Sequence, residues 1–365
     1  MGSAYEQAKQ IKDLVVKANK IVIVQADNPD ADSLGSALAL EHVLGDLGKE
    51  PYLYCGVDMP GYLRYLAGWD RVTKDLPNQF DLSIIVDAST MTLFEKLSQS
   101  GQQGQLAAKP CVVLDHHEVV DNKVPFAPVT INDPQRSSAG ELIYQLAKQL
   151  EWPLSVEAQG FLMTCILGDT QGLTNQLASA ETYRVMAAMV DAGVNRPKLE
   201  ELRREYSKMP PEIYKYKADL IKRTQFAVDS RLALVTIPQA EISQYSPLYN
   251  PGPLIQGDML QTTGVEVAIV LKHYTDGKVT AAIRCNPTAG VAAELAQHFG
   301  GGGHTFAAGF KTTDGRPLDQ IKSECLNFTT ELLDKLLLER LNKARQQIKQ
   351  GKTHSFTEVF GENKK

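Results

Sequence analysis

Three consecutive residues, Asp115, His116 and His117, carry the side chains best suited to chemistry in this sequence. They directly follow the apolar segment 111–114, which is typical of a buried strand. A carboxylate and two imidazoles are costly to bury without a partner, and a divalent metal ion would convert such groups into ligands. The alternative is a surface turn that happens to contain two histidines.

Acidic residues also follow other apolar segments of the N-terminal half. Because ligands of an open α/β sheet bind beyond the carboxyl ends of its strands, acidic groups at several such ends favour a common site. They are Asp30 and Asp32 after a predicted strand at 21–24, Asp87 after one at 82–86, and Asp169 after a buried helix at 155–168.

These acidic residues also have ordinary structural interpretations. Asp32 or Ser33 would serve as the N-cap of a helix predicted over 34–47, and Asp87 would begin an Asx-turn. Asp169 fits less well, because the dipole opposes a carboxylate at the carboxyl end of a helix. Gly35, early in the predicted helix, leaves room for a ligand to approach.

The acidic groups and the histidines together form a mixed oxygen and nitrogen donor set. Such a set suits two Mn²⁺ ions, or Mg²⁺, better than structural zinc, which favours cysteine. Two ions about 3.5–4 Å apart activate a water molecule and stabilise both oxygens in a phosphoryl displacement. The set comprises Asp30, Asp32, Asp87, Asp115, His116, His117 and Asp169.

A second distinctive feature is the run Gly300, Gly301, Gly302 and Gly303 before His304. Each glycine costs backbone entropy, so we expect the run to expose backbone N–H groups to an anion rather than to serve packing. Arg284, at the end of a predicted strand, is a candidate fork for phosphate. The alternatives are a flexible loop with an incidental histidine and a solvated arginine.

Composition and patterning predict a soluble α/β protein of about two domains. Hydrophobic residues make up 43% of the 365, the net charge is −5, and no basic stripe indicates binding of long nucleic acids. The five cysteines lack the short spacing of a zinc ribbon, and Cys111 and Cys165 fit the core. We find no signal peptide and no apolar run of about 18 residues, and therefore expect a cytoplasmic protein without a membrane span.

The predicted elements organise the chain into four segments. Strands alternating with helices predict a mainly parallel open sheet with flanking helices in the N-terminal domain, and a smaller α/β C-terminal domain across a cleft. The expected segments are a metal-binding domain over 1–194, a helical linker over 195–224, a substrate-binding domain over 225–330 and a helical tail over 331–365.

With these motifs in this order, the chain resembles the DHH phosphoesterase family with its associated C-terminal domain, and within it the bacterial nanoRNA and phosphoadenosine-phosphate phosphatases. The motifs that carry the resemblance are Asp27-Asn28-Pro29-Asp30-Ala31-Asp32, Asp87, Asp115-His116-His117, Gly168-Asp169-Thr170, and Gly300 to His304 followed by Ala307-Ala308-Gly309. The resemblance covers roughly residues 10–330.

The resemblance also implies roles for individual residues. Asp30 and Asp87 would hold one metal ion, while Asp32, Asp87, His116 and Asp169 would hold the other. His117 would lie beside the scissile phosphate, so His116, His117 and Asp115 are the expected catalytic residues. The associated domain would bind the far end of the substrate with Arg284, the glycine run and His304.

One position departs from the family pattern: the first-motif histidine is replaced by Ala26. Since alanine cannot ligate a metal, the first site would fill less readily, require more Mn²⁺ or use Asp27 instead. A milder departure is Cys285, where many relatives have serine.

The leading interpretation is a metal-dependent phosphodiesterase that hydrolyses very short oligonucleotides or linear dinucleotides to mononucleotides. Removal of the 3′-phosphate of phosphoadenosine phosphate and cleavage of a cyclic dinucleotide are alternatives within the same enzyme class. The competing class, favoured by Ala26, is a nucleotide-binding sensor without turnover. Similar proteins are often dimers, so a homodimer is expected by analogy.

Overall fold

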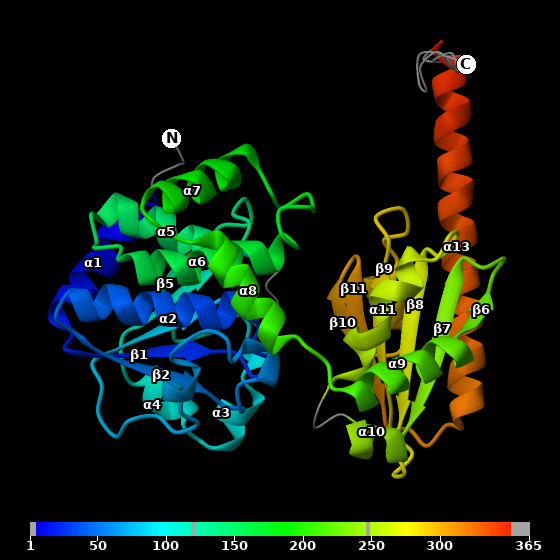
Figure 1. Ribbon diagram of the computed structural model, residues 1–365, viewed down its shortest axis with the longest axis horizontal. Helices are drawn as coiled ribbons and strands as arrows, with labels where there is room; N and C mark the ends of the chain where they lie inside the picture. The colour runs from blue at the N-terminus through cyan, green and yellow to red at the C-terminus, as the bar shows by residue number, and fades with distance from the viewer. Residues whose placement is uncertain (1–4, 118–121, 246–248, 352–365) are drawn as a thin grey trace. The chain divides into compact units, whose positions relative to one another are not determined.

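A computed structural model describes residues 5–117, 122–245 and 249–351 of the chain. The protein forms two compact units, one ending at Lys208 and the other beginning at Met209 (Figure 1). Each unit has its own sheet and its own hydrophobic clusters. The two units are therefore described one at a time, and the finer division into four segments stays a prediction.

The N-terminal unit is built on a five-stranded, all-parallel sheet in the order β2-β1-β3-β4-β5. The central strands are apolar on both faces and almost fully buried, as expected for a parallel sheet covered on both sides. This sheet confirms the predicted α/β fold. The strands are β1 (Lys20–Gln25), β2 (Glu50–Cys55), β3 (Leu82–Val86), β4 (Cys111–Asp115) and β5 (Val129–Asn132).

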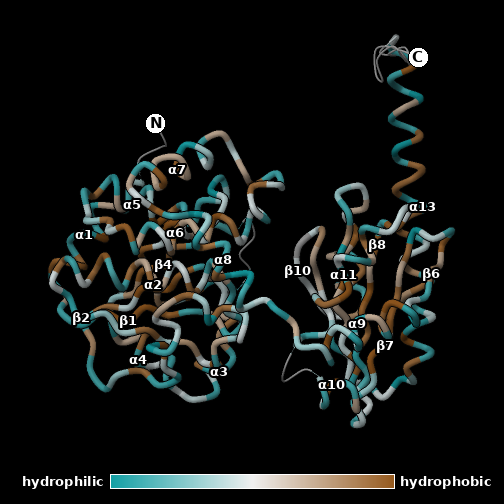
Figure 2. The backbone as a smooth tube through the Cα atoms, viewed as in Figure 1, coloured by the Kyte–Doolittle hydropathy of each residue, from teal (hydrophilic) through white to brown (hydrophobic). Residues whose placement is uncertain are grey.

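Helices cover this sheet, and the larger of its two hydrophobic clusters lies under the longer ones. Figure 2 shows hydrophobic segments along the strands and inner helices of the unit. The helices are α1 (Ala8–Lys17), α2 (Ala31–Asp46), α3 (Glu95–Gln99), α4 (Gln103–Ala107), α5 (Ala139–Leu150), α6 (Val156–Asp169), α7 (Ala180–Asp191) and α8 (Arg196–Tyr206).

Helices α2, α5 and α6 pack closely because two glycines face Cys165 of α6. A Cβ atom at Gly35 would lie 2.6 Å from Cys165 Sγ, and one at Gly140 would lie 2.3 Å from Cys165 Cβ. The expectation that Gly35 makes room for a ligand is therefore wrong, since the space is filled by α6. This packing fixes the relative position of the start of α2, the start of α5 and the end of α6.

The C-terminal unit contains a mixed six-stranded sheet in the order β10-β11-β9-β8-β7-β6, in which β7 and β8 are parallel. One face packs against α12 and α13, and α9 to α11 lie against the other. This confirms a second, smaller α/β region. Its elements are α9 (Pro211–Arg223), β6 (Gln225–Ala227), β7 (Leu232–Pro238), α10 (Gln239–Tyr245), α11 (Pro251–Gln261), β8 (Val267–His273), β9 (Val279–Cys285), α12 (Ala292–His298), β10 (Gly302–His304), β11 (Ala307–Thr312) and α13 (Leu318–Lys349).

Two glycines of the run serve packing, which the sequence had been expected to exclude, while binding of an anion by the run stays a prediction. Its last two members belong to β10, which pairs with β11. A Cβ atom at Gly301 would lie 2.2 Å from the Gly309 oxygen, and one at Gly303 would lie 2.5 Å from Ala308 Cα. Gly303 also has a φ of 138°, which side chains disfavour. Close approach of two backbones therefore requires at least these two glycines.

The element boundaries differ from the predicted ones in two places near the site. Helix α2 begins at Ala31, three residues before the predicted start, and the short strand β5 has no counterpart among the predicted elements. Helix α13 spans Leu318–Lys349 and accounts for the described part of the predicted tail; residues 352–365 lie outside the described residues. Among the described helices, none has the length and apolar character needed to cross a membrane.

Candidate metal centre

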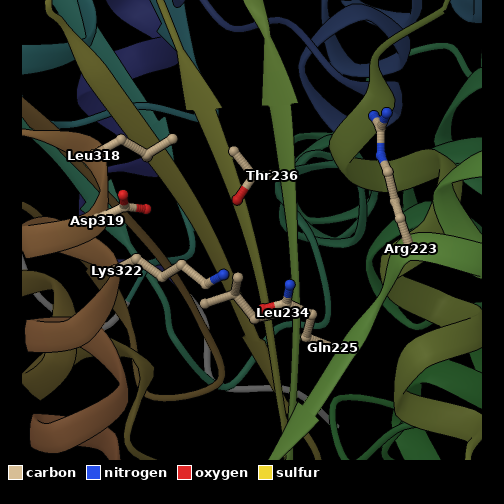
Figure 3. Close-up of a pocket in the computed structure, with 7 residues that line it drawn as sticks. All are labelled: Arg223, Gln225, Leu234, Thr236, Leu318, Asp319 and Lys322. Atoms are coloured by element: carbon tan, nitrogen blue, oxygen red, sulfur yellow. The ribbon is translucent and has the colours of Figure 1, made fainter.

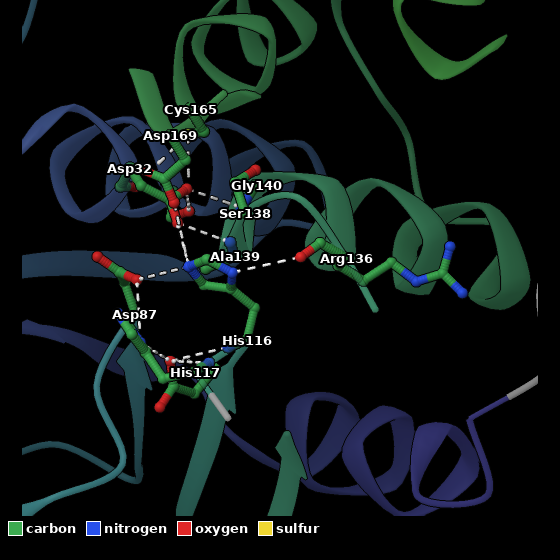
Figure 4. Close-up of polar contacts among 12 residues, drawn as sticks. Asp32, Asp87, His116, His117, Arg136, Ser138, Ala139, Gly140, Cys165 and Asp169 are labelled. Atoms are coloured by element: carbon green, nitrogen blue, oxygen red, sulfur yellow. Dashed lines mark hydrogen bonds and ion pairs between the residues drawn. The ribbon is translucent and has the colours of Figure 1, made fainter. Parts of the chain in front are cut away.

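His116 lies at the centre of the acidic cluster (Figure 4). Its Nε2 atom is 3.1 Å from Asp169 Oδ2, 3.5 Å from Asp32 Oδ2 and 3.6 Å from Asp87 Oδ1. On the other side of the ring, Nδ1 is 3.3 Å from the Arg136 carbonyl oxygen. If Nδ1 donates to that carbonyl, Nε2 is left as the atom that can ligate a metal ion.

Asp32 is held by the amino-terminal end of α5. Its Oδ2 accepts a hydrogen bond from the Ala139 N–H at 2.6 Å, and its Oδ1 accepts one from the Gly140 N–H at 2.9 Å. The positive end of the helix dipole stabilises this fully buried carboxylate. Asp32 lies inside α2, so it is not the cap; the cap is Asp30, whose Oδ1 accepts from the N–H groups of Asp32 and Ser33 at 3.0 Å.

Asp87 follows β3 in a left-handed backbone conformation, with a φ of 56°. Such a conformation is uncommon outside glycine and occurs at functional sites. Burial, together with the charges of Asp32 and Asp30, raises the pKa of Asp87 well above its usual value. A carboxylate that resists ionisation for these reasons is expected to gain from a cation.

The neighbouring buried carboxylates also shift the pKa values of Asp169 and His116. Burial and the nearby Asp32 raise the pKa of Asp169 to about 7. Burial by itself would lower the pKa of His116, but its contact with Asp169 and the negative charge of Asp32 outweigh burial and raise that pKa to about 9. In the metal-free protein, protons therefore partly compensate the negative charge of the cluster.

The donor atoms fit a metal ion. His116 Nε2 and Asp87 Oδ1 are buried, and Asp87 Oδ1 makes no hydrogen bond with the part of the chain that the structure describes. Two groups of potential ligands each have their donor atoms within 4.8 Å of one another, namely Asp32, His116 and Asp169, and Asp87, His116 and His117. Oxygen and imidazole donors of this kind suit Mn²⁺ or Mg²⁺. Asp30, predicted as a ligand, belongs to neither group.

Asp115 contacts His117 and does not belong to the carboxylates around His116 Nε2. Its Oδ1 is 2.7 Å from His117 Nδ1 and also accepts the His116 N–H at 2.8 Å. Its other oxygen accepts a short hydrogen bond from the Ser89 hydroxyl. Asp115 is 1% exposed and thus orients both histidines from beneath the site.

Sequence reasoning missed a buried pair behind the site, Arg136 and Glu141. Glu141 Oε2 accepts from the Ser137 N–H at 3.2 Å, the Ser137 hydroxyl at 2.5 Å and the Thr182 hydroxyl at 2.8 Å, and Arg136 Nη1 lies 3.5 Å from Oε1. The segment that Glu141 fixes supplies the carbonyl behind His116. A signal was present, because Ser138 followed three residues later by Glu141 matches the capping-box pattern.

Asp27 belongs to neither ligand group, although its Oδ1 is buried without a hydrogen-bond partner among the described residues. Its Oδ2 accepts the Lys96 N–H in the first turn of α3 at 2.7 Å. Ala26 is buried in the hydrophobic cluster on that side of the sheet. No described side chain in this segment thus takes the place of the missing histidine among the two ligand groups.

The predicted substrate-binding residues all belong to the C-terminal unit. Arg284 lies on β9 with an exposed side chain, opposite Ala307 of β11. His304 pairs through its backbone with the same Ala307. The end of β9 and the glycine strand therefore lie close together across β11, as the sequence motif suggested.

Comparison with known proteins places these motifs in a family. Residues 20–166 match the model described as the DHH family, N-terminal domain. The chain is 26% identical over 314 residues to the bifunctional oligoribonuclease and PAP phosphatase NrnA of Thermus thermophilus, covering 86% of this chain and 90% of that protein. It is 24% identical over 296 residues to a probable protein of the same description from Streptococcus mutans, covering 80% and 90%.

A solved structure shares the fold. The crystal structure of an exopolyphosphatase-related protein from Bacteroides fragilis superposes with a TM-score of 0.78 at 21% identity, covering 91% of this chain and 98% of that one. The four acidic ligand candidates and the Asp115-His116-His117 run lie in or just beyond the matched residues 20–166. Residues 20–166 thus match the N-terminal domain of the DHH family, and the chain resembles NrnA-type proteins along most of its length.

Proposed function

We propose that this protein is a metal-dependent phosphodiesterase that hydrolyses very short oligonucleotides or linear dinucleotides to mononucleotides. The observation that carries the proposal is the convergence of Asp32, Asp87 and Asp169 on His116 Nε2, with the buried Asp87 Oδ1 lacking a hydrogen-bond partner among the described residues. The descriptions of the two NrnA-type relatives support this substrate class and add phosphoadenosine phosphate as a second substrate.

The residues of the site have distinct proposed roles. Asp32, Asp87, His116 and Asp169 would hold one ion, and Asp87 with Asp30 would hold the other. Bound Mn²⁺ or Mg²⁺ supplies a water of lowered pKa and offsets negative charge on the phosphoryl oxygens. His117, oriented by Asp115 at 2.7 Å, contacts the scissile phosphate. Asp115 acts through His117 and is a positioning residue.

The N–H groups of α5 that bind Asp32 hold its carboxylate in place. The Arg136 carbonyl, 3.3 Å from Nδ1, keeps the His116 ring in one orientation. On the C-terminal unit, Arg284 and the glycine strand are the proposed contacts for the rest of the substrate.

A decisive test combines turnover with metal binding. The protein is incubated with linear diadenylate and Mn²⁺, and products are separated by chromatography; Mn²⁺ binding is followed separately by thermal stabilisation. We expect adenosine monophosphate and a metal-dependent rise in Tm, and the Asp169→Asn variant to lose both. Parallel incubations with phosphoadenosine phosphate and cyclic diadenylate rank the alternatives within the enzyme class.

Ala26 favours one competing function, a nucleotide sensor with a weakened first metal site. Its signature in the same experiment is saturable binding of diadenylate without product at any Mn²⁺ concentration. A slow reaction that rises steeply at high Mn²⁺ would instead indicate an enzyme whose first site fills poorly. Restoring the ligand with Ala26→His then increases the rate at low Mn²⁺ if the missing imidazole is the cause.

A further inference from the structure

The sheet of the C-terminal unit has one face that is only partly covered. Residues of β9 and β11 alternate between the core under α12 and α13 and the opposite face. On that opposite face, the cluster formed with α9 to α11 draws its strand residues from β7 and β8. Side chains of β9 and β11 on this side are accordingly half-buried or exposed.

The strand register arranges the residues of this face in rows. Lys272 of β8 and Lys311 of β11 both pair with Thr280 of β9, and we call these three residues the lysine row. Four residues further along β9, Arg284 pairs with Ala307. At a rise of about 3.3 Å per residue, the lysine row lies about 13 Å from Arg284 along the strand.

The surface between the lysine row and Arg284 carries only small side chains. It is formed by Ala282 and by Gly309, which pair with each other, and the start of α11 borders it, since a Cβ atom at Gly252 would lie 3.8 Å from Ala282 Cβ. A Cβ atom at Gly309 would lie 2.7 Å from the Ala281 oxygen, so a larger residue is excluded there. A small-residue floor with cations at both ends matches the shape of an extended polyanion.

The cations of this face lack acidic partners. Among the described residues, no carboxylate lies within ion-pair distance of Lys272, Lys311 or Arg284, whereas most other described arginines of the unit have one. The Lys272 ammonium donates to Asn250 Oδ1 at 3.0 Å, and burial lowers its pKa. A partly desolvated ammonium without an anion favours an external one.

We propose that the lysine row binds a second phosphate of an oligonucleotide whose other phosphate is bound near Arg284. This inference rests on the proposed function and deepens it, because it gives the site a length preference. In a stacked single strand each nucleotide advances about 3.4 Å, so about 13 Å corresponds to about four nucleotides, and to fewer in an extended strand. Dinucleotides are too short to use the lysine row, whereas oligomers of about five nucleotides reach it.

A different hollow of the same unit does not offer this chemistry. It has a volume of about 280 Å³ and is lined by residues of β6, β7 and the start of α13 (Figure 3). Its guanidinium, Arg223, is already paired with Glu241, and Asp319 adds a negative charge beside Lys322. The lysine row and Arg284 instead have no described carboxylate within ion-pair distance, whereas this hollow mixes both signs of charge.

The test measures binding without turnover. Fluorescence polarisation of labelled di- and pentaadenylate is recorded without divalent metal for the full chain and for Lys311→Ala and Lys272→Gln. Lys278→Ala is the matched control, because this lysine of the same unit lies over the Tyr274 ring. We expect each test variant to weaken pentamer binding about threefold or more and to reduce the slope of log K against log salt by about 0.7, with dinucleotide affinity within about twofold.

The inference would be overturned if the test variants weakened dimer and pentamer binding equally or left the salt slope unchanged. It would also be overturned if Lys278→Ala weakened pentamer binding as much, or if the wild type did not bind the pentamer. The proposed function fails separately, when the wild type binds but does not hydrolyse diadenylate with Mn²⁺. A length-selective loss of binding in that case still supports the lysine row. Circular dichroism and Tm confirm that each variant is folded.

Discussion

The acidic cluster and the lysine row carry opposite charges and are built in opposite ways. The carboxylates of the cluster are mostly buried, and Asp32 is held by two backbone N–H groups. The cations of the lysine row are half-buried or exposed on long side chains. A group that must meet a metal ion at fixed distances requires a rigid, desolvated setting, whereas recognition of a polyanion tolerates mobile charges in water.

The largest effect is expected from Asp87→Asn, which tests whether the cluster is built for metal rather than for stability. Activity should fall by more than about a hundredfold, because even changes behind a metal ligand cost about 10- to 100-fold. The metal-free protein should become more stable, since the raised pKa of Asp87 shows that its charge is unfavourable there. Rates and urea unfolding in EDTA measure the two effects; lower stability would contradict the account.

Glu141→Gln tests whether rigidity behind the cluster matters. Losing the charged acceptor should loosen the segment that holds His116 and Asp32, and weaken Mn²⁺ affinity by about 10- to 100-fold. Thr182→Val is the matched variant, because it removes one donor to Glu141 and leaves the Ser137 contacts. Calorimetric Mn²⁺ titration should rank wild type, Thr182→Val and Glu141→Gln in order of decreasing affinity; identical affinities would exclude a positioning role.

The acidic cluster should make the stability of the metal-free protein depend on pH. Asp169 has a pKa raised from 3.8 to about 7, and His116 one raised from 6.5 to about 9, so the folded state binds protons more tightly than the unfolded state. The resulting stability is complete below the unfolded values and is lost as pH rises, through about 7 for Asp169 and about 9 for His116. Urea unfolding in EDTA should show this decrease between pH 5 and 9.

Excess Mn²⁺ should reduce or reverse that trend, because deprotonated ligands bind the ion better. The Asp169→Asn variant provides the control, since the part of the decrease below about pH 7 should shrink. A metal-free protein whose stability rises over this pH range would show that protons do not compensate the cluster.

The smallest effect on activity is expected from Asp27→Ala. Its carboxylate accepts the Lys96 N–H instead of joining the cluster, so rates and Mn²⁺ stoichiometry should change less than about twofold. Stability should fall by about 1 kcal/mol, the usual cost of losing a cap at a helix start. A large loss of activity with unchanged stability would show that Asp27 replaces the missing histidine.

The comparison also separates what sequence could predict from what it could not. Acidic ends of apolar strands located Asp87 and Asp115, since a parallel sheet brings such ends to one edge. The roles of the glycines and of Glu141 depend on tertiary packing. Gly35 is required by helix α6, which is distant in sequence, and Gly303 by the pairing of β10 with β11, which follows within five residues. Glu141 was missed because its partners come from helix α7 and from the segment before α5.

The five cysteines have a practical consequence. All are buried, and burial raises the pKa to about 11 for Cys55, Cys111 and Cys285, to about 12 for Cys325 and well above the usual value for Cys165. Thiols that remain protonated and shielded react slowly with alkylating reagents. A single cysteine introduced at an exposed position, such as Leu338 of α13, would therefore take up a maleimide dye selectively, without removal of any native thiol.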